Sequence, residues 1–200
     1  MVRIIRGCIG LIGLLAICFA LTTQAKNFQT TLQTTQRAAE KGDAQAQFDL
    51  GTLYITGGAG VAKDSAKAIE WLKKAAEQGH ADAQSNLGVI YYTGQGVATN
   101  YDKALKWLQK AANQDNATAQ FNLGYMYAKG EGVATNYAKS AEWFQKAAEQ
   151  GHAEAQAMIG AMYYEGRGVD RSEVKGIEWI RKAAAQGNAK AKQMLQMIKK

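Results

Sequence analysis

The segment AIEWLKKAAEQG, residues 68–79, decides the fold because it returns three times further along the chain. The later copies are ALKWLQKAANQD at residues 104–115, SAEWFQKAAEQG at 140–151 and GIEWIRKAAAQG at 176–187. The four tryptophans therefore follow one another at a constant interval of 36 residues. A fixed period of this size indicates stacked repeats, each too small to bury its own apolar face.

The composition favours helices that end at glycine turns. Of the 200 residues, 47% are hydrophobic and 20% are charged, which suits a folded chain and is too polar for a polytopic membrane protein. The sequence has 21 glycines and no proline. With few β-branched residues as well, this predicts an all-α fold.

The net charge of +7 is concentrated at the two ends of the chain. The long segment between the basic ends is close to neutral, at −1. A nucleic-acid binder needs a continuous basic stripe that displaces counterions from phosphates. We therefore expect no nucleic-acid partner.

Residues 1–25 have the pattern of a secretory signal peptide. Two arginines precede an apolar run at residues 7–21, and small residues stand before a cleavage site after Ala25. The run of 15 residues is shorter than the ~20 that a membrane-spanning helix needs, so a retained anchor is the weaker alternative. We expect an exported, periplasmic or secreted protein with no stable membrane span after cleavage.

Both cysteines, Cys8 and Cys18, lie in this leader. Lipidation of Cys18 is a second alternative, although Ile17 is bulky for such a site. The mature chain would hold no disulfide and no thiolate ligand or nucleophile.

Each repeat begins with the pattern A-x-A-Q-x-x-L-G-x-x-Y, with Ile159 in place of the leucine in the fourth copy, and this pattern predicts its first helix. The spacing of three and four residues keeps Ala46, Leu50 and Tyr54 on one face of that helix. The glycine of the pattern removes a side chain, so that a neighbouring helix can approach closely. These structural glycines are Gly51, Gly88, Gly124 and Gly160.

A G-x-G-V loop and a second helix complete each repeat. Cap-forming residues stand in register at the start of the second helix: Asp64, Asn100, Asn136 and Ser172. The tryptophans are expected to be buried anchors of the same helix: Trp71, Trp107, Trp143 and Trp179. Charged residues at the remaining positions indicate a solvated face.

These patterns divide the chain into a leader, two caps and four repeats. Residues 26–42 are a worn copy of the second helix and predict an N-terminal capping helix. The repeats span residues 43–79, 80–115, 116–151 and 152–187. Residues 188–200 restart a first helix and predict a C-terminal capping helix.

The repeated motifs closely resemble the Sel-like repeat family, a relative of the tetratricopeptide repeats, over residues 43–187. The resemblance implies a right-handed superhelical α/α solenoid of antiparallel helix pairs. It also implies an adaptor for protein–protein contacts in signalling, secretion or host interaction. One departure is Asp115, where the other copies have glycine, which predicts local strain in the left-handed backbone.

Three features invite a chemical function, and a structural role explains each. His80 and His152 stand in phase two repeats apart, where other copies have asparagine or aspartate, so they are predicted to start helices rather than bind metal. Ser172 and Lys175 form an S-x-x-K match that follows from two repeat positions. The G-x-G loops lack a preceding strand and a third glycine, so they predict turns rather than a phosphate site.

In a tetratricopeptide-like superhelix the first helices line the concave side, and positions that vary between copies are free to recognise a partner. The predicted groove residues are Gln45, Phe48, Thr52, Asp82, Ser85, Val89, Tyr92, Thr118, Phe121, Tyr125, Lys129, Glu154, Ala157 and Tyr164. Aromatic anchors among small polar residues suit a peptide segment. The alternative is that Phe48, Phe121 and Tyr125 pack against neighbouring helices.

The sequence therefore predicts a monomeric protein-binding scaffold that is no enzyme and uses no cofactor or metal. One alternative is a periplasmic enzyme that binds or hydrolyses β-lactams, as in the cysteine-rich branch of the family. This chain lacks that branch's disulfide frame. Another alternative is a subunit that polymerises end to end, against which the polar caps argue.

Overall fold

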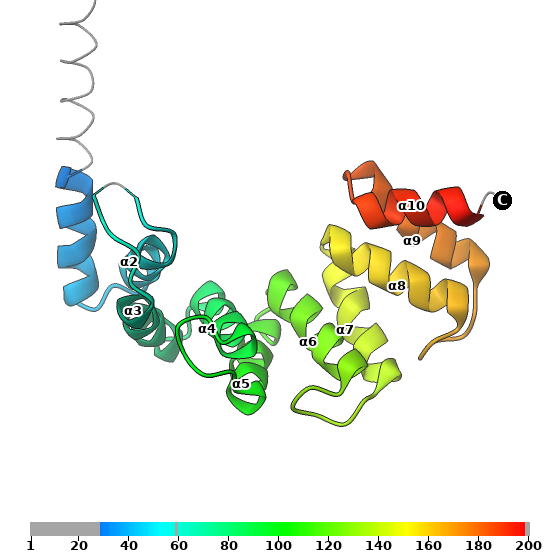
Figure 1. The fold of residues 1–200 in the computed structure, drawn as a ribbon, viewed down its shortest axis with the longest axis horizontal. Helices are drawn as coiled ribbons and strands as arrows, with labels where there is room; N and C mark the ends of the chain where they lie inside the picture. The colour runs from blue at the N-terminus through cyan, green and yellow to red at the C-terminus, as the bar shows by residue number, and fades with distance from the viewer. Residues whose placement is uncertain (1–28, 59, 199–200) are drawn as a thin grey trace, which may run out of the picture. The chain divides into compact units, whose positions relative to one another are not determined.

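The computed structural model describes residues 29–58 and 60–198 (Figure 1). The described residues form helices joined by turns and loops, with one isolated antiparallel bridge between Gly58 and Val61. The all-α prediction is confirmed. None of the described helices is both long and apolar enough to cross a membrane. The proposed signal peptide lies outside the described residues.

The chain divides into two compact units, of which the first ends at Lys74 and the second begins at Ala75. The first unit contains a helix over residues 29–40, α2 (Ala44–Thr56) and most of α3 (Ser65–Glu77). Its core includes Ala39, Ala46 and Leu50, with Trp71 packed against them, together with the fully buried Leu72.

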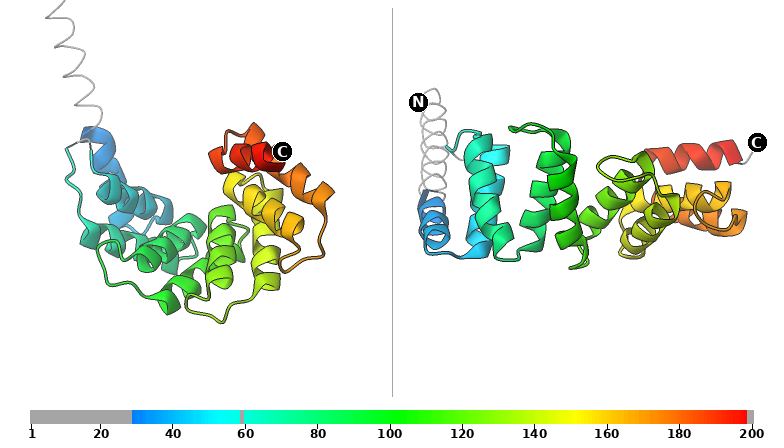
Figure 2. Two further views of the ribbon diagram at one scale, coloured as in Figure 1. Left: turned by 45° about the vertical axis from the view of Figure 1, so that its right-hand side comes forward. Right: turned by 90° about the horizontal axis from the view of Figure 1, so that it is seen from below.

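The second unit is a run of helix pairs in which each helix packs on the next, the arrangement of an α/α solenoid. Its helices are α4 (Ala81–Thr93), α5 (Tyr101–Ala112), α6 (Ala117–Lys129), α7 (Tyr137–Glu149), α8 (Ala153–Glu165), α9 (Glu173–Ala185) and α10 (Ala189–Ile198). Longer loops join the two helices of a pair, and short turns join one pair to the next (Figure 2).

The predicted helix caps are confirmed. Asn100, Asn136 and Ser172 each accept a hydrogen bond from the backbone N–H three residues later. Asp64 does the same, with 3.0 Å between its Oδ1 and the nitrogen of Lys67. Each cap satisfies a backbone donor that the first turn of a helix leaves unpaired.

The glycine of each first helix lies against a buried side chain of the second helix. A Cβ added at Gly88 would lie 2.5 Å from Cγ of Leu108, and one at Gly124 would lie 2.6 Å from Cδ1 of Phe144. A Cβ added at Gly51 would lie 2.8 Å from Cγ of Leu72, and one at Gly160 would lie 2.8 Å from Cγ1 of Ile180. No side chain larger than hydrogen fits at these contacts without movement of the partner.

The tryptophans are half-buried, which differs from the expected full burial. The residue that follows each tryptophan is the fully buried one, as at Leu108, which is 0% exposed. The outer side of each indole carries a lysine from the next helical turn. The ammonium of Lys110 lies 4.5 Å from the centre of the Trp107 ring, and that of Lys182 lies 4.1 Å from Trp179.

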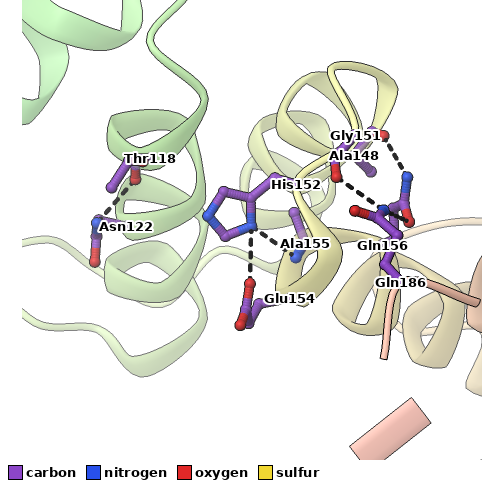
Figure 3. Close-up of polar contacts among 9 residues, drawn as sticks. All are labelled: Thr118, Asn122, Ala148, Gly151, His152, Glu154, Ala155, Gln156 and Gln186. Atoms are coloured by element: carbon purple, nitrogen blue, oxygen red, sulfur yellow. Dashed lines mark hydrogen bonds and ion pairs between the residues drawn. The ribbon is translucent and has the colours of Figure 1, made fainter. Parts of the chain in front are cut away.

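Buried glutamines connect one repeat to the next. Gln156 donates from Nε2 to the carbonyl of Ala148 at 3.1 Å, and its Oε1 accepts from Nε2 of Gln186 at 2.8 Å (Figure 3). Gln84 and Gln120 make the same pair of bonds in their repeats. Each glutamine thus satisfies a carbonyl at the end of the preceding helix and accepts a donor from the following pair. The sequence marks these glutamines as repeated without showing this role.

His80 and His152 are N-caps, as predicted. Nδ1 of His152 accepts from the backbone nitrogen of Ala155 at 3.3 Å, and the imidazole stacks on the Phe121 ring of α6 at 4.7 Å. Figure 3 shows the His152 ring between α8 and the helix that carries Thr118 and Asn122. Burial lowers the pKa of His152, against the opposing effect of the nearby Glu154 carboxylate. The neutral imidazole is therefore the form that this site favours.

Asp115 has φ of 59° and is the one residue other than glycine with positive φ in the described part of the chain. Glycine stands at the equivalent position in other copies, as at Gly151 with φ of 91°. The Asp115 carboxylate also competes for the donor of the buried glutamine. Nε2 of Gln120 donates to Oδ1 of Asp115 and to the carbonyl of Ala112, at 3.3 Å each. The predicted strain at Asp115 is thus accompanied by a divided hydrogen bond.

We expect Asp115→Gly to raise the free energy of unfolding by about 1 kcal/mol, because glycine adopts positive φ without a Cβ clash. Urea denaturation measures the change. Gly151→Ala is the matched control: an added Cβ meets no atom within 4 Å, so only the backbone cost applies. This variant should be destabilised to a similar degree. A loss of stability in Asp115→Gly would show that the carboxylate contributes more than the strained backbone costs.

We expect acidification to destabilise the protein in part through His152. Since its folded-state pKa is lowered, the unfolded chain binds the proton more readily. The stability from the neutral cap is fully present above the ordinary pKa of about 6.5 and is lost as the pH falls through the folded value. The urea concentration at the unfolding midpoint should therefore decrease when the pH is lowered from about 7.5 to about 5.

His152→Asn is the control, because asparagine caps the equivalent helices after Asn116 and Asn188 without titrating. Its urea midpoint should fall less than that of the parent over the same pH interval. Equal falls in the two proteins would assign the acid sensitivity to other groups.

Candidate functional site

The predicted groove residues of the first unit lie on α2. Gln45 is exposed and donates to the carboxylate of Asp49 at 2.8 Å. Phe48 and Thr52 are half-buried. These residues offer a small polar surface with one aromatic ring.

In the second unit, two predicted groove residues are buried and cannot contact a partner without repacking. Ser85 is 3% exposed and Ala157 is 2% exposed. Their small side chains lie where helices approach one another, which explains both their size and their burial. The prediction for these two positions is therefore corrected.

The predicted groove residues Asp82 and Glu154 lie at the surface, and each makes a polar contact; that of Asp82 joins α4 to the start of α6. Asp82 accepts a hydrogen bond from Nδ2 of Asn116 at 2.7 Å, and Glu154 lies 3.5 Å from Nδ1 of His152. Thr118 and Lys129 are exposed, and Val89 is half-buried.

Phe121 serves mainly as a packing residue. Its ring is stacked on His152 and lies 5.6 Å from the ring of Phe144. Tyr164 lies at the far end of the unit, where it lines a pocket of about 270 Å³ together with Met194 and Met197 of α10. Phe121 lies one helical turn before Tyr125 on α6, and both rings pack against the same buried cluster.

Tyr92, Tyr101, Tyr125 and Glu131 come together as a group that we term the tyrosine cluster. The centre of the Tyr92 ring, on α4, lies 5.6 Å from Tyr101 at the start of α5 and 6.5 Å from Tyr125 on α6. The Tyr92 and Tyr125 rings meet edge to face. Tyr101 is 38% exposed, so the cluster is open to solvent.

Glu131 joins the cluster from the loop between α6 and α7. The hydroxyl of Tyr92 donates to Oε2 of Glu131 at 2.6 Å. The next residue, Gly132, fixes the loop: a Cβ there would lie 2.8 Å from Cβ of Tyr101. Burial, together with the Glu131 carboxylate, raises the pKa of Tyr92, so the phenol remains a donor throughout the physiological range.

Sequence reasoning found Tyr92 and Tyr125 but missed Tyr101 and Glu131. The missed residues belong to a second helix and a loop, outside the first helices that line a tetratricopeptide-like groove. One signal was present: the middle residue of the G-x-G loop changes from Gln95 to Glu131 to Arg167. Variation inside a repeated loop marks a position that the scaffold does not fix.

Ser172 and Lys175 are used by the local structure. Oγ of Ser172 accepts from the backbone nitrogen of Lys175 at 3.4 Å, and the Lys175 ammonium lies 5.6 Å from the centre of the Tyr163 ring. Similar lysine–tyrosine contacts occur at Lys103 and Lys139. The S-x-x-K match thus coincides with a helix cap and a repeated cation–π contact.

Two solved structures with well-matched folds are Sel1 repeat proteins. The protective antigen c5321 of uropathogenic Escherichia coli strains, which displays an SLR fold, is 43% identical, with a TM-score of 0.78 over 82% of this chain. This chain spans only 35% of that protein. A Sel1 repeat protein from Oxalobacter formigenes is 34% identical, with a TM-score of 0.79 over 86% of this chain and 69% of that one.

A more distant structure is cysteine rich protein B of Helicobacter pylori, at 25% identity and a TM-score of 0.53. The match covers 68% of this chain and 99% of that protein. No curated protein matches the chain.

The family model of the Sel1 repeat matches the sequence four times, at residues 44–80, 81–116, 117–152 and 153–188. Each match begins at the first residue of a first helix, as at Ala81 and Ala117. Sel1 repeats typically form scaffolds for protein–protein interaction. On these matches and on its helix-pair architecture, this chain belongs to the Sel1 repeat family.

Proposed function

We propose that this protein is a scaffold that binds a peptide segment of a partner protein at the tyrosine cluster of its second unit. The observation that carries the proposal is a group of three neighbouring tyrosines beside a carboxylate, in which Tyr101 is exposed and Tyr92 and Tyr125 are half-buried. Tyrosine supplies a large contact area with few rotatable bonds and a polar end, and it is enriched where proteins bind one another.

The division between repeated and varied positions supports this assignment. Residues that recur in each copy are committed to the interior, as at Gly88, Leu108 and Gln120. Two cluster residues have no such repetition: Tyr125 corresponds to Val89 and Ala161, and Glu131 to Gln95 and Arg167. The other two recur once each, Tyr92 as Tyr164 and Tyr101 as Tyr137. Positions that differ between copies are those at which recognition can differ from one scaffold to another.

We further propose that the protein works outside the cytoplasm. The leader pattern at residues 1–25 supports export. The similarity to an antigen of uropathogenic strains agrees with a location at or beyond the envelope. A role in envelope signalling, secretion or host interaction fits such a scaffold.

Selection from a random peptide library tests the binding site even while the natural partner is unidentified. Peptides selected on the purified protein should lose at least about tenfold in affinity for Tyr101→Ala and for Tyr125→Ala, as expected when an anchor residue is truncated. Isothermal titration measures each affinity, and circular dichroism checks the fold.

Tyr137→Ala is the matched control. Tyr137 stands one repeat after Tyr101 and is 41% exposed, yet it lies outside the cluster. Its removal should leave the affinity unchanged. Selected peptides that bind all three variants as tightly as the parent would contradict the proposed site.

A further inference from the structure

The carboxylate of the tyrosine cluster belongs to Glu131. Oε2 of Glu131 accepts the hydroxyl of Tyr92, and this bond fixes the orientation of the group. Within residues 29–58 and 60–198, no lysine, arginine or histidine forms an ion pair with Glu131. A half-buried carboxylate gains from an added cation more than an exposed one, because solvent screens it less.

The rings beside Glu131 also favour a cation. The face of an aromatic ring carries negative potential and attracts ammonium and guanidinium groups. The chain already shows this at the edge of the cluster, where the Lys129 ammonium lies 5.7 Å from the centre of the Tyr125 ring. Tyr101, the most open of the three rings, has no such internal cation among the contacts of the described chain.

The next repeat provides an internal template for the missing cation. Arg167 occupies the loop position of Glu131, and its guanidinium carbon lies 5.5 Å from the centre of the Tyr137 ring. Tyr137 is the counterpart of Tyr101, and Gly168 packs on it as Gly132 packs on Tyr101. Arg167 also pairs with Glu165 at 3.0 Å. One repeat thus holds an arginine between a tyrosine and a carboxylate, whereas the repeat before it presents a tyrosine and a carboxylate alone.

We propose that the tyrosine cluster receives an arginine side chain of the partner peptide, which stacks on Tyr101 and pairs with Glu131. This inference rests on the proposed function and specifies the chemistry of its ligand. Arginine suits the site better than lysine, because its planar guanidinium can stack on a ring and bind a carboxylate with two parallel hydrogen bonds. The partner segment would therefore be basic at this point.

Titration with short blocked peptides tests the arginine subsite directly. The probes are acetyl-Gly-Arg-Gly-amide and its citrulline counterpart, which keeps the shape and most of the hydrogen-bond donors but has no charge. Resonances of the tyrosine rings in the purified protein report binding even when it is weak. The arginine peptide should shift the Tyr92, Tyr101 and Tyr125 signals until they saturate. The affinity from this titration should be at least about tenfold higher than that of the citrulline peptide.

Glu131→Gln should lower the affinity for the arginine peptide by at least about tenfold. The amide oxygen still accepts the hydrogen bond of the Tyr92 hydroxyl but provides no charge. Glu165→Gln is the control, since Glu165 is paired with Arg167 and lies outside the cluster; this variant should bind as the parent does. Equal binding of the arginine and citrulline peptides, or unchanged binding to Glu131→Gln, would overturn the proposal.

The library-selected peptides separate this proposal from the broader one. If they require Tyr101 and Tyr125 but bind Glu131→Gln as tightly as the parent, the cluster binds peptides and the arginine subsite is wrong. If they require neither tyrosine, the proposed function itself fails. A loss of affinity in all three variants, with arginine present in the selected sequences, supports both.

Discussion

The contact between a glycine of each first helix and the large side chain of the second helix is the constraint on which the rest depends. It brings two helices close enough for Phe144 to lie over Gly124, and for Leu108 to lie over Gly88. A closely packed pair presents a flat apolar side to the next pair, so successive pairs bury alanines against one another. The helix caps and the glutamine bonds refine this arrangement, but they act on helices that the glycine contact has already placed.

Much of this fold can be predicted from the sequence, because its determinants are local and are repeated four times. Helix starts follow from cap residues such as Asn100 and Asn136, and helix faces follow from spacing. The burial of the tryptophans is less predictable. Their position along the helix suggests that they are buried, yet the residue after each tryptophan is the one that packs against the glycine of the first helix. Lysines such as Lys110 cover the outer side of the indole.

The candidate site can be predicted only in part, since it depends on contacts between segments that are distant in sequence. Tyr92 and Tyr125 lie on the predicted faces, whereas Tyr101 and Glu131 reach them because the loop after α6 packs on the start of α5. No pattern within one repeat shows this contact. Ser85 and Ala157 illustrate the opposite error: a variable small residue can be a packing residue whose size suits one particular helix crossing.

The buried glutamines also affect how the second unit comes apart. Unfolding of the segment that contains Gln186 would break its hydrogen bond to Oε1 of Gln156, and the same holds for Gln150 and Gln120. Such a bond contributes about 0.5–1.5 kcal/mol net, so each repeat stabilises its neighbour. Such nearest-neighbour coupling favours cooperative melting over independent fraying, and it keeps a surface built from several repeats, such as the tyrosine cluster, intact until the unit unfolds.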